Sequence, residues 1–181
     1  IAERNFEGKP SLMYGTIQEI SSLKNMENEL KENAAKFSSI FHFSPVGISL
    51  NEFESGRFIE ANEVLLNKLG FTNDEITNLA FSDVTPLEYN YIERNKKDEL
   101  LKSSKFGPYE KEYRRKDGST FPILCNCLKF TDSSGRELIL TINQDISEQK
   151  KLINDLNQQR IKSSQDALYY KSLLENNSFF V

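Results

Sequence analysis

Residues 110–147 read EKEYRRKDGSTFPILCNCLKFTDSSGRELILTINQDIS, and this stretch carries clear strand and turn signals. Two short polar segments divide it, Asp117-Gly118 and Ser133-Ser134-Gly135. Glycine supplies the positive φ that tight hairpin connections require, so both segments are typical of turns between strands. The stretch therefore predicts three consecutive strands that pair as an antiparallel meander.

Both faces of these predicted strands are largely apolar, because successive side chains of a strand point to opposite sides. In the middle strand one face holds Phe121, Ile123, Cys125 and Cys127, and the other holds Pro122, Leu124, Asn126 and Leu128. In the last strand Leu138, Leu140 and Ile142 alternate with Ile139, Thr141 and Asn143. Such a sheet needs two covers: helices of the same domain on one face, and a flanking helix or a second subunit on the other.

The composition limits the class of protein. With 181 residues, the chain can form one domain with a proper core plus additional segments. Its net charge of −4 gives no reason to expect nucleic acid, and the basic run Arg114-Arg115-Lys116 is most simply a solvated hairpin. No window holds the ~18 consecutive apolar residues of a membrane span, so we expect a cytoplasmic segment without membrane contact.

The chain begins at Ile1 rather than Met, so we expect it to be a fragment of a longer parent protein. A membrane anchor elsewhere in that parent is compatible with this expectation. Its two cysteines, Cys125 and Cys127, lie two apart on one strand face. This spacing disfavours a disulfide, and two thiols without a neighbouring His make a poor zinc site. We therefore expect free thiols and no metal.

An internal similarity indicates how the chain is organised. Residues 15–30 align without gaps on residues 141–156, and residues 37–48 resemble residues 170–181. Apolar positions at spacings of three and four, interrupted by polar ones, predict marginal helices between the units. The expected boundaries are 1–20 for the final strand of a preceding unit, 21–36 for a helical linker, 37–147 for one complete unit, 148–170 for a second linker, and 171–181 for the start of a following unit.

Local signals predict the elements of the complete unit. Alternation indicates strands at residues 46–53 and 57–61. Asn62 and Gly70 are suited to cap a helix over residues 63–69. The segment Thr72-Asn73-Asp74-Glu75 is a capping box that begins a further short helix. A longer helix is expected from Pro86 to about Ser103, with four inner residues: Leu87, Tyr91, Leu100 and Leu101.

This order of elements resembles the PAS sensor domain. The segments that carry the resemblance are NEVLLNKLGF (residues 62–71), GPYEKEYRRKDG (residues 107–118) and QDISEQK (residues 144–150). The resemblance covers essentially all of residues 37–147. It implies an α+β fold, in which a five-stranded antiparallel sheet carries short helices on one face and is flanked by amphipathic linker helices.

The resemblance also implies a function. PAS domains are sensory or dimerising modules, so we expect a non-catalytic segment of a bacterial-type histidine kinase or diguanylate cyclase. The expected partners are a second copy of the chain, neighbouring PAS units, an output domain and a small molecule. Two functions stay open: a sensor gated by a ligand in an inner pocket, and a ligand-free relay that dimerises and transmits strain.

The resemblance implies two sets of site residues. Asn143 stands where flavin-binding members place an inward polar residue that contacts ligand, so we expect a small pocket lined by Asn143, Thr141, Cys125 and Tyr91. Asp145 is the acidic residue of the closing motif. We expect it to pair with Arg114 or Arg115 and to couple the sheet to the outgoing helix.

The cofactor stays open, although two classes fit poorly. Flavin-binding light sensors carry a cysteine in an Asn-Cys-Arg-Phe-type motif, where this chain has residues 79–83 without one. This difference argues against a covalent flavin adduct. Haem-binding members place a histidine in the long helix, whereas the single histidine here, His42, precedes the first predicted strand. Haem is therefore not expected either.

Overall fold

The computed structural model describes residues 11–89, 92 and 99–177. The chain divides into two compact units, Ile1–Pro45 and Val46–Val181. The first unit contains helix α1, Ser11–Phe43. Ion pairs one helical turn apart lie along its surface, with 2.6 Å between Lys31 and Glu27 and 2.7 Å between Lys36 and Glu32. Such pairs support an exposed helix at this spacing.

The start of α1 corrects one expectation. Residues 11–20, the described part of the strand expected over 1–20, are helical, and residues 37–43, expected in the PAS unit, continue the same helix. A single strand without a partner leaves its backbone groups unpaired, whereas a helix pairs them within its own segment. The derivation of residues 1–20 from a preceding unit stays a prediction.

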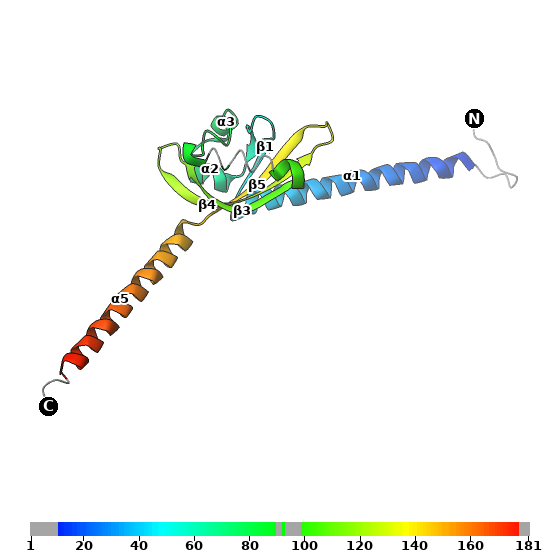
Figure 1. Cartoon of the computed structure of the whole chain (residues 1–181). Coiled ribbons are helices and arrows are strands. Elements are labelled where there is room, and N and C mark those ends of the chain that lie inside the picture. Colours follow the sequence, from blue (N-terminus) through cyan, green and yellow to red (C-terminus); the bar gives the residue numbers. More distant parts are fainter. Residues whose placement is uncertain (1–10, 90–91, 93–98, 178–181) are drawn as a thin grey trace. The chain divides into compact units, whose positions relative to one another are not determined.

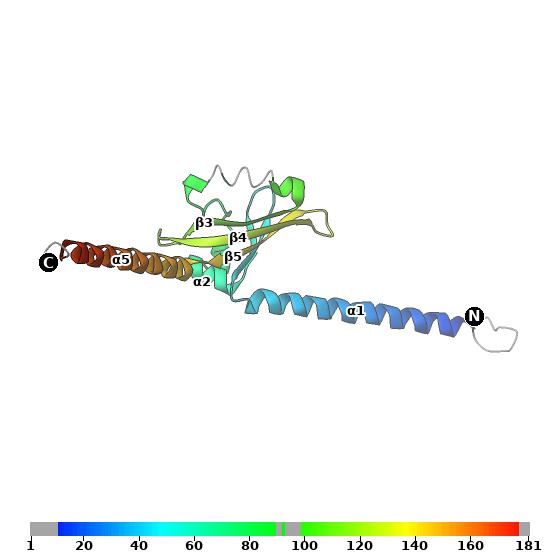
Figure 2. The ribbon, with the colours of Figure 1, turned by 60° about the horizontal axis from the view of Figure 1, so that its bottom comes forward.

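The second unit is built on a five-stranded sheet, as the sequence predicts. Its strands are β1 (Gly47–Glu52), β2 (Phe58–Ala61), β3 (Lys105–Arg114), β4 (Thr120–Thr131) and β5 (Glu137–Asp145). They lie in the order β2-β1-β5-β4-β3, and all neighbours are antiparallel. The last three strands form the predicted meander (Figures 1 and 2).

Short helices connect the two halves of this sheet. Helix α2 spans Glu63–Leu69, with Asn62 as its N-cap and Gly70 as its left-handed C-cap at φ 78°. Helix α3, Asn73–Ile76, begins with the predicted capping box. A 3₁₀ turn, η1, spans Leu87–Tyr89, and helix α5 follows the sheet as Ser147–Asn177. None of the helices in the described ranges is long and apolar enough to cross a membrane.

The residues expected to face inward from a long helix after Pro86 are only partly found there. Residues 99–103 are helical and Leu100 is buried, but Leu101 is 55% exposed and Leu87 is 75% exposed. Neighbouring helical residues are about 100° apart around the axis, so Leu100 and Leu101 do not both face the core. Leu87 belongs to the 3₁₀ turn, whose period differs. Tyr91 lies outside the described residues.

The sheet has one covered face, the inner face, and one partly exposed face, the outer face. The segment from α2 to η1 lies over the inner face (Figure 1). The main core cluster joins that segment to the strands: Phe58, Ala61, Leu65, Leu69, Ile76, Val84, Tyr113, Phe121, Ile123 and Cys125. On the outer face Leu128, Phe130 and Ile142 remain 38–40% exposed. The predicted alternation of both strands is confirmed.

Candidate functional site

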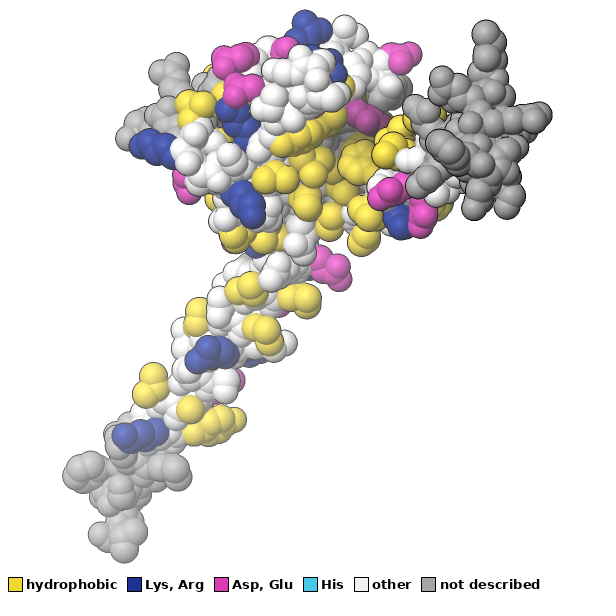
Figure 3. All heavy atoms as spheres, turned by 90° about the vertical axis from the view of Figure 1, so that its right-hand side faces the viewer, with side chains coloured by type: hydrophobic (Ala, Val, Ile, Leu, Met, Phe, Trp, Pro, Cys, Tyr) yellow, Lys and Arg dark blue, Asp and Glu magenta, His cyan; other side chains and the backbone are white. Residues whose placement is uncertain are grey.

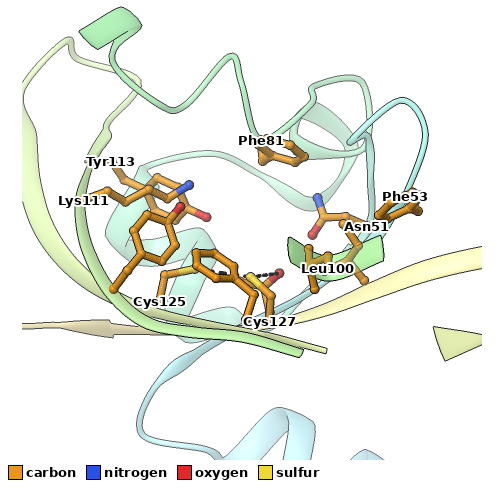
Figure 4. A pocket seen from close by; sticks show the side chains of 12 residues that line it. Asn51, Phe53, Phe81, Leu100, Lys111, Tyr113, Cys125 and Cys127 are labelled. Carbon is orange, nitrogen blue, oxygen red and sulfur yellow. Dashed lines mark hydrogen bonds between the residues drawn. The ribbon is translucent and has the colours of Figure 1, made fainter. Parts of the chain in front are cut away.

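A cavity of about 50 Å³ lies on the inner face of the sheet. Its wall combines aromatic, aliphatic and polar side chains: Asn51, Phe53, Phe81, Leu100, Phe106, Tyr109, Lys111, Tyr113, Cys125, Cys127, Ile139 and Thr141. Figure 4 shows Lys111 and Tyr113 on one side, Asn51 and Phe53 on the other, and the two cysteines below. Protein interiors hold few voids larger than a water molecule, so this cavity is a candidate binding site.

Strand pairing brings the polar wall residues together. Thr141 of β5 lies between two strands, opposite Cys127 of β4 and opposite Ser49 of β1. All three side chains share the inner face because directly paired residues point to the same side. Further along the sheet, Asn51 lies opposite Ile139. Of these residues, Thr141, Cys127 and Asn51 line the cavity, whereas Ser49 does not.

Lys111 is the unusual member of the wall. It is only 4% exposed, and its Nζ donates to Thr85 Oγ1 at 3.4 Å. The ammonium also lies 4.9 Å from the ring centre of Tyr113, and 5.7 Å from those of Phe81 and Tyr109. Such cation–π contacts are worth about 0.5–2 kcal/mol each. They hold a buried positive charge beside the cavity.

Phe81 reaches this ammonium because its ring packs against a turn in which a glycine has no side chain. Gly56 has φ 72°, and a Cβ there would come within 2.5 Å of the Phe81 ring. The backbone confirms the contact, since Phe81 N donates to Gly56 O at 3.0 Å. The glycine between β1 and β2 therefore positions one wall of the cavity.

Asn51 holds the same turn from the opposite side. Its Nδ2 donates to Gly56 O at 3.1 Å, and its Oδ1 accepts from Ser49 Oγ at 2.9 Å. Both ends of the amide are thus engaged within the protein. Asn51 is a rigid polar wall residue rather than a side chain that reorients freely.

The two cysteines form no disulfide with each other, and both lie at the floor of the cavity. Their Sγ atoms lie 3.6 Å apart, and Thr141 Oγ1 lies 3.8 Å from Cys127 Sγ. Sulfur is a weak hydrogen-bond partner, so the Thr141 hydroxyl is only weakly held. It remains suited to donate to a molecule in the cavity.

Asn143 is buried on the inner face but does not belong to the cavity wall described above. It is 3% exposed and lies opposite Cys125 in the sheet. Within the described part of the chain, neither its Nδ2 nor its Oδ1 finds a hydrogen-bond partner. A buried amide without partners is costly, so a water or a ligand atom is expected beside it.

The predicted pocket is thus only partly assembled from its predicted residues. Thr141 and Cys125 line the cavity. Asn143 lies two residues after Thr141 on the same face of β5, outside the cavity wall, and Tyr91 lies outside the described residues. Lys111 and Asn51 were missed. Strand alternation contained a signal for Lys111, because it places this lysine on the same face as Tyr109 and Tyr113.

A second candidate site lies at the end of β5, where Asp145 connects three elements. Its Oδ2 accepts from Lys68 of α2 at 2.7 Å, and its Oδ1 accepts from the backbone N–H of Ser147 at 2.9 Å. Ser147 is the first residue of α5. Partial burial acts to raise the pKa of Asp145, but hydrogen bonds from Lys68 and Ser147 outweigh it, so this pKa lies below the ordinary 3.8.

The partner of Asp145 corrects the expectation of an arginine. Arg114 Nη2 donates to Asp83 O at 2.9 Å. Arg115 Nε donates to Lys68 O at 3.1 Å, and its guanidinium stacks 4.3 Å from the Phe121 ring centre. Both arginines, at the end of β3 and directly after it, therefore bind other partners. Lys68, which lies on the exposed side of α2, reaches the carboxylate instead.

Comparison with known proteins agrees with this geometry. A sequence model of the PAS domain matches residues 45–148. The chain belongs to the PAS domain family. PAS domains are sensor modules typical of signal-transduction proteins, and the module itself is not catalytic.

One curated relative is the methyl sulfide methyltransferase-associated sensor of Methanosarcina acetivorans. It is 25% identical over 122 residues, which cover 67% of this chain. The match spans only 12% of that sensor's length. The match therefore does not assign the activity of the whole relative to this chain.

Solved PAS structures share the fold. The PAS domain of an HTR-like protein from Haloarcula marismortui is 24% identical with a TM-score of 0.52, over 68% of this chain and 99% of that one. A domain of a sensory box sensor histidine kinase/response regulator from Geobacter sulfurreducens is 16% identical with a TM-score of 0.55, over 64% of this chain and 96% of that one. At these sequence identities, the similarity shows a shared fold alone.

Proposed function

We propose that this PAS domain senses a small molecule and relays its presence along a multidomain signal-transduction protein. The observation that carries the proposal is the cavity of about 50 Å³ with a buried cation and hydroxyl in its wall. A single water needs about 10–15 Å³ of such volume. The cavity thus has room for a few waters, or for a molecule of a few heavy atoms that replaces them.

The proposed relay is supported by the contacts through which the sheet continues into α5. Ile146 is buried, and its N–H donates to Pro122 O of β4 at 3.1 Å. Lys150 of α5 lies 2.7 Å from Glu110 of β3. Together with Asp145, these contacts tie the first turn of α5 to three elements of the domain. A shift of the strands on ligand binding would therefore move the start of α5.

The proposed parent is a sensor histidine kinase or a diguanylate cyclase that acts as a homodimer. Both long helices carry exposed apolar side chains, which a second copy would cover. In α1 these are Leu23, Met26, Leu30, Phe37 and Ile40, and in α5 they are Leu152, Ile153, Leu156, Ile161, Leu168, Tyr169, Tyr170 and Leu173. Figure 3 shows hydrophobic side chains, in yellow, on the visible side of α5. Neighbouring PAS units and an output domain belong to the same proposal.

Native mass spectrometry of the purified chain, beside its denatured mass and an absorption scan, tests the sensing function. We expect a mass excess that is lost on denaturation. Thr141→Leu should abolish it by filling the cavity, and Ile142→Leu, the neighbouring residue on the outer face, should preserve it. A clean polypeptide mass in both variants and in the unmodified chain would contradict a co-purifying ligand.

The alternative is a ligand-free module that dimerises and relays strain. The partly exposed apolar residues of the outer face, Leu128, Phe130 and Ile142, favour it because a second sheet could cover them. A dimer with a clean mass, dissociated by Leu128→Lys but unaffected by Thr141→Leu, would support this alternative over sensing.

A further inference from the structure

We infer that the cavity on the inner face binds a small uncharged molecule with one hydroxyl group, of the class of the short-chain alcohols. The inference deepens the proposed sensing function and rests on it. It concerns the chemical class of the ligand, which the charge, the polar groups and the size of the cavity restrict.

The charge of the wall disfavours charged ligands. Among the described residues that line the cavity, Lys111 is the sole charged side chain, and none is Asp or Glu. Its ammonium is already engaged by Thr85 Oγ1 and by the three aromatic rings around it. A cation in the cavity would meet like charge. An anion would lose its hydration beside a cation that already has protein partners. An uncharged ligand incurs neither cost.

The polar groups of the wall favour a ligand that donates a hydrogen bond. Asn51 already uses both ends of its amide within the protein. Thr141 Oγ1 donates to Cys127 Sγ across 3.8 Å, and a hydroxyl that donates in this way keeps two lone pairs that can accept. A ligand hydroxyl can therefore donate to Thr141 while the contact with sulfur stays intact. A ketone or an ether, which only accepts, would have to replace that contact.

The apolar part of the wall and the volume restrict the rest of the ligand. Phe53, Leu100 and Ile139 border the cavity, so an alkyl group placed there leaves water for an apolar environment. If each heavy atom takes the roughly 10–15 Å³ that a water needs, a volume of about 50 Å³ holds about three to five of them. Ethanol, propanol and butanol are of this size, whereas hexanol exceeds it.

An NMR titration of the full chain with propan-1-ol tests the inference. The methyl signals of Ile139, which lines the cavity, report on the site, and those of Ile142, on the outer face, are the internal control. We expect saturable shifts at Ile139 and none at Ile142. A molecule with about four heavy atoms binds with a Kd no tighter than about 0.05 mM, so millimolar concentrations are needed.

A series of alcohols measures the size of the site. Each CH₂ group that enters an apolar site should tighten binding by about fourfold. We expect this gain from ethanol through propan-1-ol to butan-1-ol, and weaker binding of hexan-1-ol, which overfills the cavity. A gain that continues through hexan-1-ol would indicate an open apolar surface and would overturn the inference.

Probes of equal size separate charge from hydrogen bonding. Acetate and n-propylammonium have as many heavy atoms as propan-1-ol, and at constant ionic strength each should bind at least about tenfold more weakly. Acetone has as many heavy atoms as propan-2-ol but cannot donate. It should bind about threefold to tenfold more weakly than that alcohol, because it lacks the hydrogen bond to Thr141 Oγ1.

Two variants assign this preference to Thr141. Thr141→Val removes the hydroxyl at nearly constant volume, so propan-2-ol and acetone should then bind equally. Thr120→Val makes the same change at an exposed position of β4 and should leave the preference intact. If Thr141→Val does not fold, the comparison of propan-2-ol with acetone in the unmodified chain decides alone.

The outcomes separate the two proposals. Tighter binding of a charged probe than of propan-1-ol, or equal binding of acetone and propan-2-ol to the unmodified chain, would overturn the alcohol class while the cavity remained a ligand site. A mass excess without a saturable shift for any probe would do the same. No shift together with a clean native mass would overturn both the ligand class and the sensing function. An alcohol preference lost only in Thr141→Val supports the inference.

Discussion

The inner face of the sheet has two regions that differ in packing. Under α2, ten buried residues form a continuous core that includes Leu65 and Ile123. Beside it, a smaller cluster of Phe53, Leu100, Phe106 and Ile139 borders the cavity, with Tyr109 and Cys127 shared between the two clusters. We expect the large cluster to contribute most of the stability, and the space beside the small cluster is the proposed ligand site. The same strands therefore serve both purposes, and only the covering residues differ.

The sharpest test of this difference is a cavity made in the large cluster. Leu65 is 2% exposed, so Leu65→Ala should lower the free energy of unfolding by about 3–4 kcal/mol. Urea denaturation measures the loss. Leu152→Ala, on the exposed surface of α5, should change it by less than about 0.5 kcal/mol. Comparable losses in both variants would show that the large cluster is not the stabilising region.

A second test removes the polar group that ties α2 to the sheet. Asn62 is fully buried, and its Oδ1 accepts from the N–H groups of both Leu65 and Ile48, while its Nδ2 donates to Val46 O. We expect Asn62→Ala to cost about 2–3 kcal/mol, measured by urea denaturation, because cap and strand lose partners together. Thr72→Ala, which removes the exposed cap of α3, should cost about 1 kcal/mol. A smaller loss for Asn62 than for Thr72 would contradict this role.

A third test makes the same small substitution in each region. Ile123→Val removes a methyl group from the dense core and should cost about 1–1.5 kcal/mol. Ile139→Val should cost only about 0.5 kcal/mol, because Ile139 borders the cavity and its methyl groups have fewer neighbours to lose. Both values come from denaturant midpoints. An equal or larger cost at Ile139 would mean that the small cluster is as tightly packed as the large one.

The smallest expected effect concerns the ion pair of Asp145 and Lys68. The pKa of Asp145 is lower in the folded state, so its contribution is present above the unfolded value of 3.8 and is lost as pH falls through the folded pKa. Asp145→Asn should therefore cost up to about 1 kcal/mol near pH 7 and less near pH 3, below the unfolded value. Urea unfolding at the two pH values measures the difference. A cost that is independent of pH would show that the charge of Asp145 does not stabilise the folded state.

Much of the fold follows from local sequence signals. Asn62, Gly70 and the Thr72–Glu75 capping box set helix ends, and the structure has them at those residues. The alternation of β4 and β5 sorts side chains between inner and outer faces, because the period of a strand is two. The prediction was wrong where a segment was expected to be a strand although no pairing strand was identified for it. Residues 11–20 were expected as a strand by similarity to β5, but the described chain is helical there.

The site depended far more on contacts between distant residues. Alternation is able to place Lys111 on the inner face, but it does not show that three rings surround its ammonium. The partner of Asp145, Lys68, lies 77 positions away in the sequence. It belongs to α2, and the alternation of the strands does not predict where this helix packs. Both facts depend on how α2 and the Phe81 loop pack over the sheet.

The sequence alone is thus enough to predict the order of the elements, their caps and the face of each strand residue, since these depend on neighbours within a few positions. It does not predict the position of the cavity, the environment of Lys111 or the partner of Asp145. A void and a buried charge are properties of the space between elements. That space is defined by the packing of segments that lie far apart in the chain.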